Sequence, residues 1–270
     1  MLDAIPKIGY GTWQRRGDEA RNGVLAALEA GYRHIDTAEG YENEKDVGQG
    51  IAESGVARDD FWITTKVAPE NFGPGEVRPH AEASLERLGL DQVDLLLAHW
   101  PSIDDKYDIE DYLGQLADVK AAGLARTIGV SNFTIRHIDK AVEILGADAI
   151  TTNQIELHPF LANRPIVEHC KSLGIPLTAY CPLARRAVPE DVTLQGIADD
   201  IGATPSQVAL SYLMAQGYIV IPSSSNTDRI AENLAATEVQ LTAAQLKTID
   251  GLDRNMRCVN GSWCPAWDEE

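Results

Sequence analysis

Short apolar runs recur along the chain at intervals of roughly 30 residues, and stretches with helical periodicity separate them. The runs are rich in residues that favour buried strands. Eight such runs are present, namely Ile8–Trp13, His34–Ala38, Phe61–Val67, Val93–Trp100, Thr127–Asn132, Ile150–Leu157, Leu177–Leu183 and Ile219–Ser223.

The stretches between these runs carry the start and stop signals of helices. Residues 19–30 and 78–87 repeat apolar positions with helical period. A later helix is predicted to begin with Thr204 as N-cap and Pro205 at its first position. Several helices are predicted to end at a capping glycine: Gly31, Gly89, Gly123, Gly146 and Gly174.

A strand followed by a helix, repeated eight times with no low-complexity linker, predicts a (β/α)₈ TIM barrel, for which about 250 residues is typical. We expect residues 1–270 to form a single domain, with the C-terminal segment of about 254–270 near the barrel mouth. An open doubly wound sheet is the alternative. It is disfavoured because Gly9-Tyr10-Gly11 is followed by Thr12-Trp13-Gln14 and not by the rest of a G-x-G-x-x-G fingerprint.

Composition narrows the class of protein. With 270 residues, 44% of them hydrophobic, the chain can bury a sizeable core. The net charge of −18, from 23 basic and 41 acidic residues, argues against nucleic acid as a general partner. No apolar run approaches the roughly 20 residues that span a bilayer, and the N-terminus lacks a secretory pattern. We therefore expect a cytoplasmic protein with no membrane partner, and a monomer.

Cysteine and histidine spacing gives little sign of a disulfide framework or a metal. The four cysteines are too few and too scattered for such a framework in a chain of this length. Cys258 and Cys264 alone lie close together, and a disulfide or metal role for them stays a minor alternative. The histidines show no metal-ligand spacing, so no metal is expected and a metal-dependent hydrolase lacks support.

Polar side chains stand where three successive strands end, which is where barrel enzymes place their active sites. The second run ends near Asp36 and leads to Tyr41, the third ends near Lys66, and the fourth ends near His99. A lysine buried without a partner loses several kcal/mol of hydration. We therefore expect Asp36 to pair with Lys66.

This set of residues suits reduction of a carbonyl group. The Lys66 charge would lower the pKa of Tyr41 from about 10 and let the phenol donate a proton, while His99 donates a hydrogen bond to the substrate oxygen. Taken singly, the ion pair could be structural, the tyrosine packing and the histidine a core residue. Their combination at neighbouring strand ends favours an active site.

Eight stretches, each at a predicted strand end, together form a specific pattern. They are GYGTWQ, HIDTAEGYENEKDVG, ITTK, LLLAHWP, IGVSNF, TNQIELHP, TAYCPL and IPSSSNTDRIAEN. With them the chain resembles an aldo-keto reductase over almost its whole length. The resemblance implies NAD(P)H-dependent carbonyl reduction by a catalytic tetrad of Asp36, Tyr41, Lys66 and His99, with Tyr41 as the acid.

The same resemblance implies a cofactor site. Ser131, Asn132 and Gln154 would bind the nicotinamide carboxamide, and Tyr180 would stack under its ring. The full set of implied cofactor-binding residues is Gly11, Thr12, Trp13, Ser131, Asn132, Gln154, Tyr180, Cys181, Leu183, Ile221, Ser223, Ser224, Ser225, Asn226, Arg229, Glu232 and Asn233.

The cofactor is expected to be NADPH, with use of NADH possible. Ser223 stands where the common motif has a lysine facing the 2′-phosphate, so one of two usual cations is missing. Arg229 remains, and its planar guanidinium can grip a phosphate. Arg185 and Arg186 could compensate or simply be solvated.

Substrate choice is less specified. The implied substrate-binding residues are Trp13, Tyr41, His99, Trp100 and Trp263, and we expect Trp263 to close over bound substrate. The pattern is closest to small bacterial members such as 2,5-diketo-D-gluconate reductases, which implies keto-sugar acids, methylglyoxal-like dicarbonyls or aromatic aldehydes as substrates. A cofactor-binding regulatory or structural barrel of weak activity is the alternative.

Overall fold

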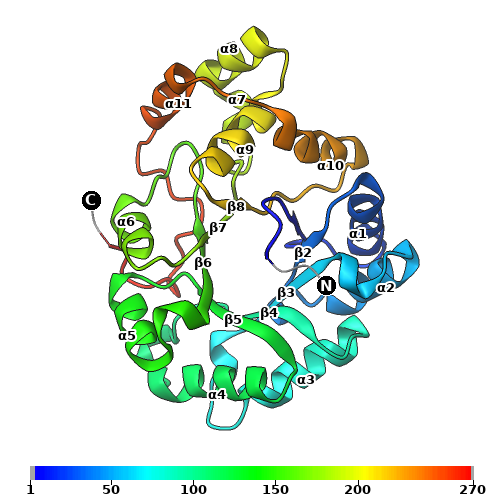
Figure 1. Ribbon diagram of the computed structural model, residues 1–270, viewed down its shortest axis with the longest axis vertical. Coiled ribbons are helices and arrows are strands. Elements are labelled where there is room, and N and C mark those ends of the chain that lie inside the picture. The colour runs from blue at the N-terminus through cyan, green and yellow to red at the C-terminus, as the bar shows by residue number, and fades with distance from the viewer. Residues whose placement is uncertain (1–3, 269–270) are drawn as a thin grey trace.

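The computed structural model describes residues 4–268, and its centre is a parallel sheet that curls into a barrel (Figure 1). Within the described residues eight strands follow one another in sequence order around the sheet. They are β1 (Tyr10–Gly11), β2 (His34–Asp36), β3 (Trp62–Val67), β4 (Val93–Ala98), β5 (Ala125–Ser131), β6 (Ile150–Glu156), β7 (Leu177–Tyr180) and β8 (Ile219–Val220).

The first and last strands close the barrel. Ile8 forms a parallel bridge with Val220, the Gly9 N–H donates to the Val220 carbonyl at 2.8 Å, and the Val220 N–H donates to the Lys7 carbonyl at 2.9 Å. The predicted (β/α)₈ barrel is thereby confirmed, and the open doubly wound sheet is excluded.

Strands β1 and β8 have two residues each, fewer than the predicted runs. The chain is tightly packed where they meet, because a Cβ on Gly11 would lie 3.0 Å from the Ile221 carbonyl oxygen. The Gly11 N–H itself donates to the Pro222 carbonyl at 2.9 Å. A side chain here would separate the two ends of the sheet.

Helices surround the sheet as an outer ring (Figure 1). The α-helices are α1 (Asp18–Ala30), α2 (Glu44–Ser54), α3 (Val77–Leu88), α4 (Ile109–Ala121), α5 (Ile135–Leu145), α6 (Arg164–Ser172), α7 (Ala187–Glu190), α8 (Val192–Ile201), α9 (Pro205–Ala215), α10 (Thr227–Leu234) and α11 (Ala243–Asp250). Short 3₁₀ turns are η1 (Glu39–Tyr41), η2 (Arg58–Asp60), η3 (Pro69–Asn71), η4 (Ile103–Asp105), η5 (Ala147–Ala149) and η6 (Ala235–Glu238). No helix among residues 4–268 is long and apolar enough to cross a membrane.

The predicted helix signals are confirmed where they were most specific. Thr204 caps α9 in a reciprocal pair, because its hydroxyl accepts from the Gln207 N–H at 3.3 Å while the Gln207 side chain accepts from the Thr204 N–H at 3.0 Å. Gly31 and Gly89 end α1 and α3 in the left-handed conformation that favours glycine.

Side-chain alternation along the strands fills the barrel interior and delivers polar groups to its mouth. Trp62 shares one face of β3 with Lys66, four residues on, because residues two apart point the same way. Leu95 and Leu97 of β4 pack against Trp62 inside the barrel. The larger apolar core lies between the strands and the surrounding helices. Burial of each such apolar side chain contributes roughly 1.5–3 kcal/mol to the free energy of folding. The packed core therefore holds the strand ends, and the polar groups that they carry, in fixed positions.

Candidate active site

Three neighbouring strands bring the four predicted catalytic residues to one end of the barrel. Asp36 is the last residue of β2, Lys66 lies near the end of β3, and His99 directly follows β4. Tyr41 ends the 3₁₀ turn η1 that follows β2. All four are therefore at the carboxyl ends of the strands, as the sequence predicts.

The buried ion pair is present. Lys66 Nζ donates to Asp36 Oδ1 at 2.5 Å and to the Thr37 carbonyl at 2.7 Å, and the Lys66 side chain has no solvent exposure. Gln154, which comes from β6, donates to Asp36 Oδ2 at 2.8 Å. Both oxygens of the Asp36 carboxylate thus accept hydrogen bonds, and the Lys66 ammonium is fixed in one position.

Tyr41 lies over this pair and beside His99. Lys66 Nζ is 5.1 Å from the centroid of the Tyr41 ring, and the Tyr41 and His99 rings meet edge to face with centroids 5.5 Å apart. Both rings are only partly buried, so they face the mouth of the barrel. The structure brings all four predicted side chains together.

The protonation states differ from one prediction. Burial raises the pKa of Tyr41 above its usual value, and the nearby Lys66 charge, which acts in the opposite direction, does not reverse this effect. The predicted lowering of the Tyr41 pKa is therefore wrong for the protein alone. The sequence indicated the charge beside the phenol but not the extent of its burial.

The other two groups have states that suit hydrogen-bond donation. Burial acts to lower the pKa of Lys66, but the neighbouring Asp36 carboxylate and Tyr41 oxygen outweigh it, so the net pKa is raised. Burial, and next the Lys66 charge, hold the pKa of His99 well below its usual value. At neutral pH the site therefore contains an ammonium, a neutral phenol that carries its proton, and a neutral imidazole.

Amide and hydroxyl groups predicted for cofactor binding form one network next to the tetrad. Ser131 Oγ donates to the Gln154 carbonyl at 2.8 Å, and Asn132 Nδ2 donates to the His99 carbonyl at 3.0 Å. The Tyr180 hydroxyl donates to Asn132 Oδ1 at 2.8 Å. Strands β4 to β7 are thus linked at their carboxyl ends.

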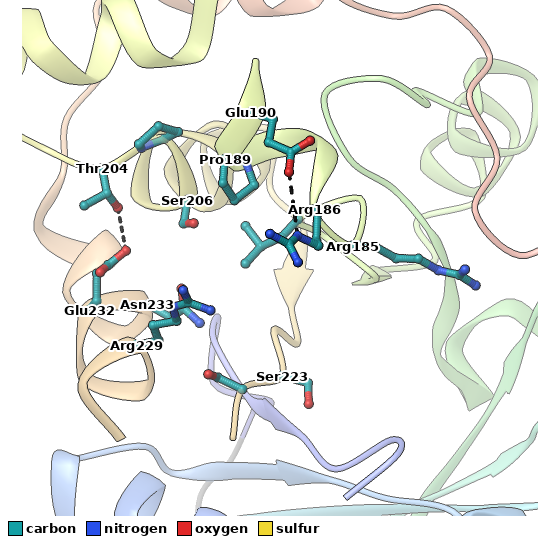
Figure 2. A pocket seen from close by; sticks show the side chains of 13 residues that line it. Arg185, Arg186, Pro189, Glu190, Thr204, Ser206, Ser223, Arg229, Glu232 and Asn233 are labelled. Carbon is teal, nitrogen blue, oxygen red and sulfur yellow. Dashed lines mark hydrogen bonds and ion pairs between the residues drawn. The ribbon is translucent and has the colours of Figure 1, made fainter. Parts of the chain in front are cut away.

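A cavity of about 540 Å³ lies between the ends of β7 and β8 and the helices α7, α9 and α10 (Figure 2). Arg229 projects into it from α10, and no carboxylate in residues 4–268 pairs with this side chain or with Arg185. Arg186 contacts Glu190 at 3.6 Å on the surface. The predicted cofactor residues that line the cavity are Leu183, Ser223, Ser224, Arg229, Glu232 and Asn233.

Other predicted cofactor residues lie along the same rim. The Thr12 hydroxyl donates to the Asp36 carbonyl at 3.1 Å, and Asn226 Oδ1 accepts from the Arg229 N–H at 2.9 Å as the N-cap of α10. Glu232 accepts a hydrogen bond from the Thr204 hydroxyl at 2.8 Å. Gly11, Cys181 and Ile221 follow or end their strands, Trp13 is exposed at the mouth, and Ser225 is exposed before α10.

Comparison with known proteins decides the family. The aldo/keto reductase family model matches residues 7–254. The chain belongs to the aldo/keto reductase family. It is an oxidoreductase that reduces carbonyl groups, as the tetrad suggests.

The similar proteins are enzymes of comparable length. Methylglyoxal reductase DkgB of Salmonella typhi is 45% identical over 98% of this chain and 99% of its own. An aldo-keto reductase of Mycolicibacterium vanbaalenii is 42% identical over 94% of this chain and 91% of its own.

Solved structures agree with this family. A crystal structure described as that of a candidate 2,5-diketo-D-gluconic acid reductase B has a TM-score of 0.94 and 38% identity, over 98% of this chain and 94% of that one. A Bombyx mori aldo-keto reductase in complex with NADP has a TM-score of 0.86 and 37% identity, over 95% and 92%.

In this aldo-keto reductase the C-terminal segment reaches the mouth through a residue that sequence reasoning missed. Trp267 packs against Trp100 with ring centroids 6.1 Å apart, and the Arg257 guanidinium lies 4.1 Å from the Trp267 centroid. Trp263, which was predicted to close over substrate, is 50% exposed. Two tryptophans near the end of the chain indicate that this segment packs over the barrel mouth. The sequence does not indicate which of the two rings contacts the barrel.

A second hollow of about 490 Å³ lies beside Tyr41 at the barrel mouth. It is lined by Trp13, Gln14, Arg15, Arg16, Gly40 and Tyr41. Arg15 pairs with Glu19 at 2.5 Å, and Arg16 pairs with Glu42 at 3.0 Å. The two cations at this entrance are therefore matched by carboxylates.

Proposed function

We propose that this reductase uses NADPH to convert small aldehydes and ketones to alcohols, with Tyr41 as the proton donor. The observation that carries the proposal is the buried Lys66–Asp36 pair beneath a phenol that keeps its proton at neutral pH. A purely structural barrel has no need of a buried ammonium at this place.

The described residues fit the cofactor at both of its ends. Amides of Asn132 and Gln154 offer donors and acceptors next to the tetrad, and Tyr180 lies beside them with its hydroxyl held by Asn132. The cavity of about 540 Å³ supplies hydroxyl groups for a phosphate, together with Arg229, which pairs with no carboxylate among residues 4–268. NADPH, when bound, supplies the hydride.

The protein's own groups handle the charge that develops on the substrate oxygen. Tyr41 would give its proton to that oxygen, and the Lys66 ammonium would stabilise the tyrosinate that remains. Asp36 keeps Lys66 charged and fixed in place. Neutral His99 would donate an N–H to the same oxygen.

Preference for NADPH over NADH rests on Arg229. Ser223 lies at the rim of the cavity where the family motif has a lysine, and an exposed serine carries no charge. Loss of one charge-assisted contact costs roughly 1.5–3 kcal/mol. We therefore propose that the enzyme accepts NADH as a weaker second cofactor.

Among carbonyl substrates we propose that small uncharged dicarbonyls such as methylglyoxal are better than keto-sugar acids, with aromatic aldehydes also accepted. Arg15 and Arg16 at the entrance are already paired, so they offer a sugar acid no unmatched cation. The relatives named methylglyoxal reductase support the same choice. A kcat/KM for a 2,5-diketo-gluconate above that for methylglyoxal would contradict it.

We also propose that the protein is a cytoplasmic monomer. Its exposed large apolar side chains in residues 4–268 are Trp13, Ile103, Val192 and Trp263, which are too few to form an extended apolar interface. Light scattering coupled to gel filtration measures the mass directly, and a dimer mass would contradict the proposal.

The test of the function compares Tyr41→Phe with Tyr107→Phe. Tyr107 is a matched control because its hydroxyl contacts only the Glu70 carbonyl, at 3.3 Å, on the surface. We expect Tyr41→Phe to lower kcat by about 10²–10⁴-fold, with the Kd for NADPH unchanged, and Tyr107→Phe to match the wild type.

Two other results are informative. Turnover retained in Tyr41→Phe would show that another group is the acid. Absence of turnover in the wild type, with NADPH still bound, would favour the alternative of a cofactor-binding barrel with a regulatory or structural role.

A further inference from the structure

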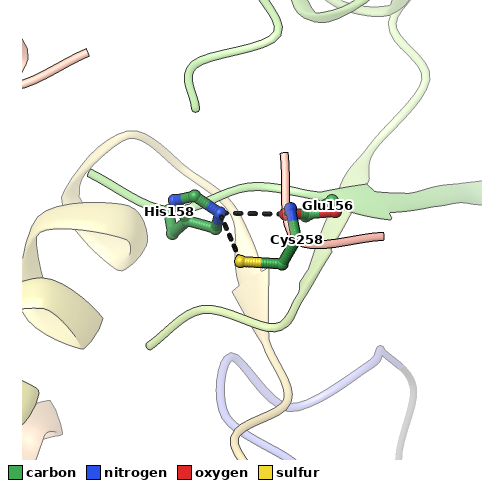
Figure 3. A group of neighbouring side chains, drawn as sticks. All are labelled: Glu156, His158 and Cys258. Atoms are coloured by element: carbon green, nitrogen blue, oxygen red, sulfur yellow. Dashed lines mark hydrogen bonds and ion pairs between the residues drawn. The ribbon is translucent and has the colours of Figure 1, made fainter. Parts of the chain in front are cut away.

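Three side chains with metal-binding atoms converge at the carboxyl end of β6, outside the tetrad (Figure 3). Glu156 is the last residue of β6, His158 follows two residues later, and Cys258 comes from the C-terminal segment. One ligand atom from each lies within 4.8 Å of the others. The Glu156 and His158 side chains have no solvent exposure.

The separations match those of a tetrahedral zinc site. With Zn–N and Zn–O bonds of about 2.0–2.2 Å and Zn–S bonds of about 2.3 Å, tetrahedral geometry puts N and O about 3.4 Å apart and N and S about 3.6 Å apart. In the protein, His158 Nε2 is 3.0 Å from Glu156 Oε1 and 3.8 Å from Cys258 Sγ. Both separations from His158 are thus within a few tenths of an ångström of the tetrahedral values.

A second thiol lies near this group but is not part of it. Cys181 directly follows Tyr180, and Tyr180 is the register partner of Glu156 in the sheet. Both thiols are free, but only the sulfur of Cys258 is among the three ligand atoms that converge.

The surroundings hold the carboxylate in place. The N–H groups of Cys258 and Val259 donate to Glu156 Oε1 and Oε2 at 2.6 and 2.9 Å. These bonds leave lone pairs for a metal and resemble the outer hydrogen bonds that orient metal ligands.

The nearby charge also suits a bound metal. Zinc with one thiolate and one carboxylate carries no net charge, so the site does not repel the Arg257 guanidinium. Arg257 is next to Cys258 and acts electrostatically on Glu156, and its Nη1 is buried with no hydrogen-bond partner in the described part of the chain.

Binding ends two hydrogen bonds. Without metal, His158 Nδ1 accepts from the Phe160 N–H at 3.3 Å and Nε2 can donate to Glu156 at 3.0 Å. Zinc on Nε2 replaces the hydrogen bond to Glu156, puts the proton on Nδ1 and ends the Phe160 contact. The Phe160 contact is longer than the 2.9–3.0 Å typical of such bonds, so its loss is small beside three metal bonds.

We propose that Cys258, His158 and Glu156 form a zinc site that fastens the C-terminal segment to the barrel mouth. Binding one Zn²⁺ releases the thiol proton of Cys258 and forms three bonds from the protein, and water takes the fourth position of the tetrahedron. The ion would join the end of β6 to the segment that carries Trp267.

The experiment measures zinc directly in the full-length protein. After chelator treatment in the presence of a phosphine reductant, the protein is titrated with Zn²⁺, and bound metal is measured by elemental analysis. Co²⁺ is then used as a spectroscopic probe, because thiolate ligands give it an intense charge-transfer band. We expect one Zn²⁺ per wild-type chain and a rise in Tm of about 5 °C in excess zinc.

The variants distinguish this site from nonspecific thiol binding. Cys258→Ser should lose stoichiometric zinc and the cobalt band. Cys264→Ser is the matched control, because Cys264 lies in the same segment and is also partly buried, and its thiol contacts the Val259 carbonyl at 3.9 Å. It should bind as the wild type does, and both variants should keep the metal-free Tm.

The proposal is overturned if the wild type binds no stoichiometric zinc, if Cys258→Ser retains it, or if Cys264→Ser loses it. The cobalt spectrum of the wild type is decisive even if a variant does not fold, because absence of a thiolate band excludes the site. None of these measurements depends on the proposed carbonyl substrate.

Discussion

The buried Lys66–Asp36 pair should be costly to break but inexpensive to replace as a whole. Asp36→Asn leaves the Lys66 ammonium without solvent and with the Thr37 carbonyl as its remaining strong acceptor. Removing one partner of a buried pair typically costs about 3–5 kcal/mol, because the other charge stays buried and unpaired. For a chain of this size that loss corresponds to a fall in Tm of roughly 6–20 °C.

The double variant Asp36→Asn/Lys66→Met removes both charges and fills the space of the lysine. Replacement of a whole buried pair by groups of similar volume is often neutral or stabilising. We therefore expect the double variant to regain most of the stability that Asp36→Asn loses. It should not regain activity, because no cation remains beside Tyr41, and kcat should stay lower by about 10²–10³-fold.

The assay is urea unfolding followed by tryptophan fluorescence, together with NADPH oxidation in the presence of methylglyoxal. Equal m-values in all variants would show that the same surface is exposed on unfolding, so that shifts in midpoint report stability. Lys140→Met is a control on the surface, where Lys140 pairs with Glu143 at 2.7 Å. Its unfolding midpoint should not change.

Two results would refute this reasoning. A cost below about 1 kcal/mol for Asp36→Asn would mean that the ammonium finds water or another partner, since such values are typical of exposed pairs. Wild-type kcat in the double variant would mean that the Lys66 charge has no part in proton transfer.

Three further changes test the cofactor site, the buried His34 and the C-terminal segment. Ser223→Lys should raise the ratio of kcat/KM for NADPH over NADH by about tenfold or more, because it adds a charge-assisted contact worth roughly 1.5–3 kcal/mol; an unchanged ratio would place residue 223 away from the 2′-phosphate. Burial lowers the pKa of His34 to about 4 from 6.5, so the unfolded chain takes up the proton first and stability should fall by up to roughly 3 kcal/mol as the pH drops from 6.5 to 4. His34→Asn should flatten this dependence in urea unfolding, and an equally steep fall in the variant would assign it to other groups. Truncation after Asn260 removes Trp263 and Trp267 and should change the relative kcat/KM among carbonyl substrates, whereas unchanged specificity would exclude both rings; the single Trp→Ala variants then show which ring matters.

Much of the catalytic end of the barrel could be predicted from local pattern. Parallel strands present their carboxyl ends at one edge, so Asp36, Lys66 and His99, each at the end of an apolar run, were expected to meet. The same pattern overestimated β1 and β8, because Ile8, Ile221 and Pro222 are buried next to these strands without being part of them, and Trp13 is exposed.

Quantities that depend on burial could not be obtained in this way. The Lys66 charge beside Tyr41 predicted a lowered pKa, but the opposing effect of desolvation is larger, and only the packed structure sets its size. Trp267 packs against Trp100 while Trp263 is half exposed, because the path of the C-terminal segment is determined by its contacts with the barrel.

The sequence by itself determined the order of strands and helices, the closed barrel and the identity of the residues at its mouth, because side-chain periodicity and capping act over a few residues. Only the tertiary structure decided which distant groups meet. Gln154 holds Asp36 from across the barrel, and Glu156 holds the backbone of Cys258 from a hundred residues away. Such contacts form only when the fold brings together residues that are far apart in the sequence. The pKa values of the groups involved then depend on all the residues that exclude water from them.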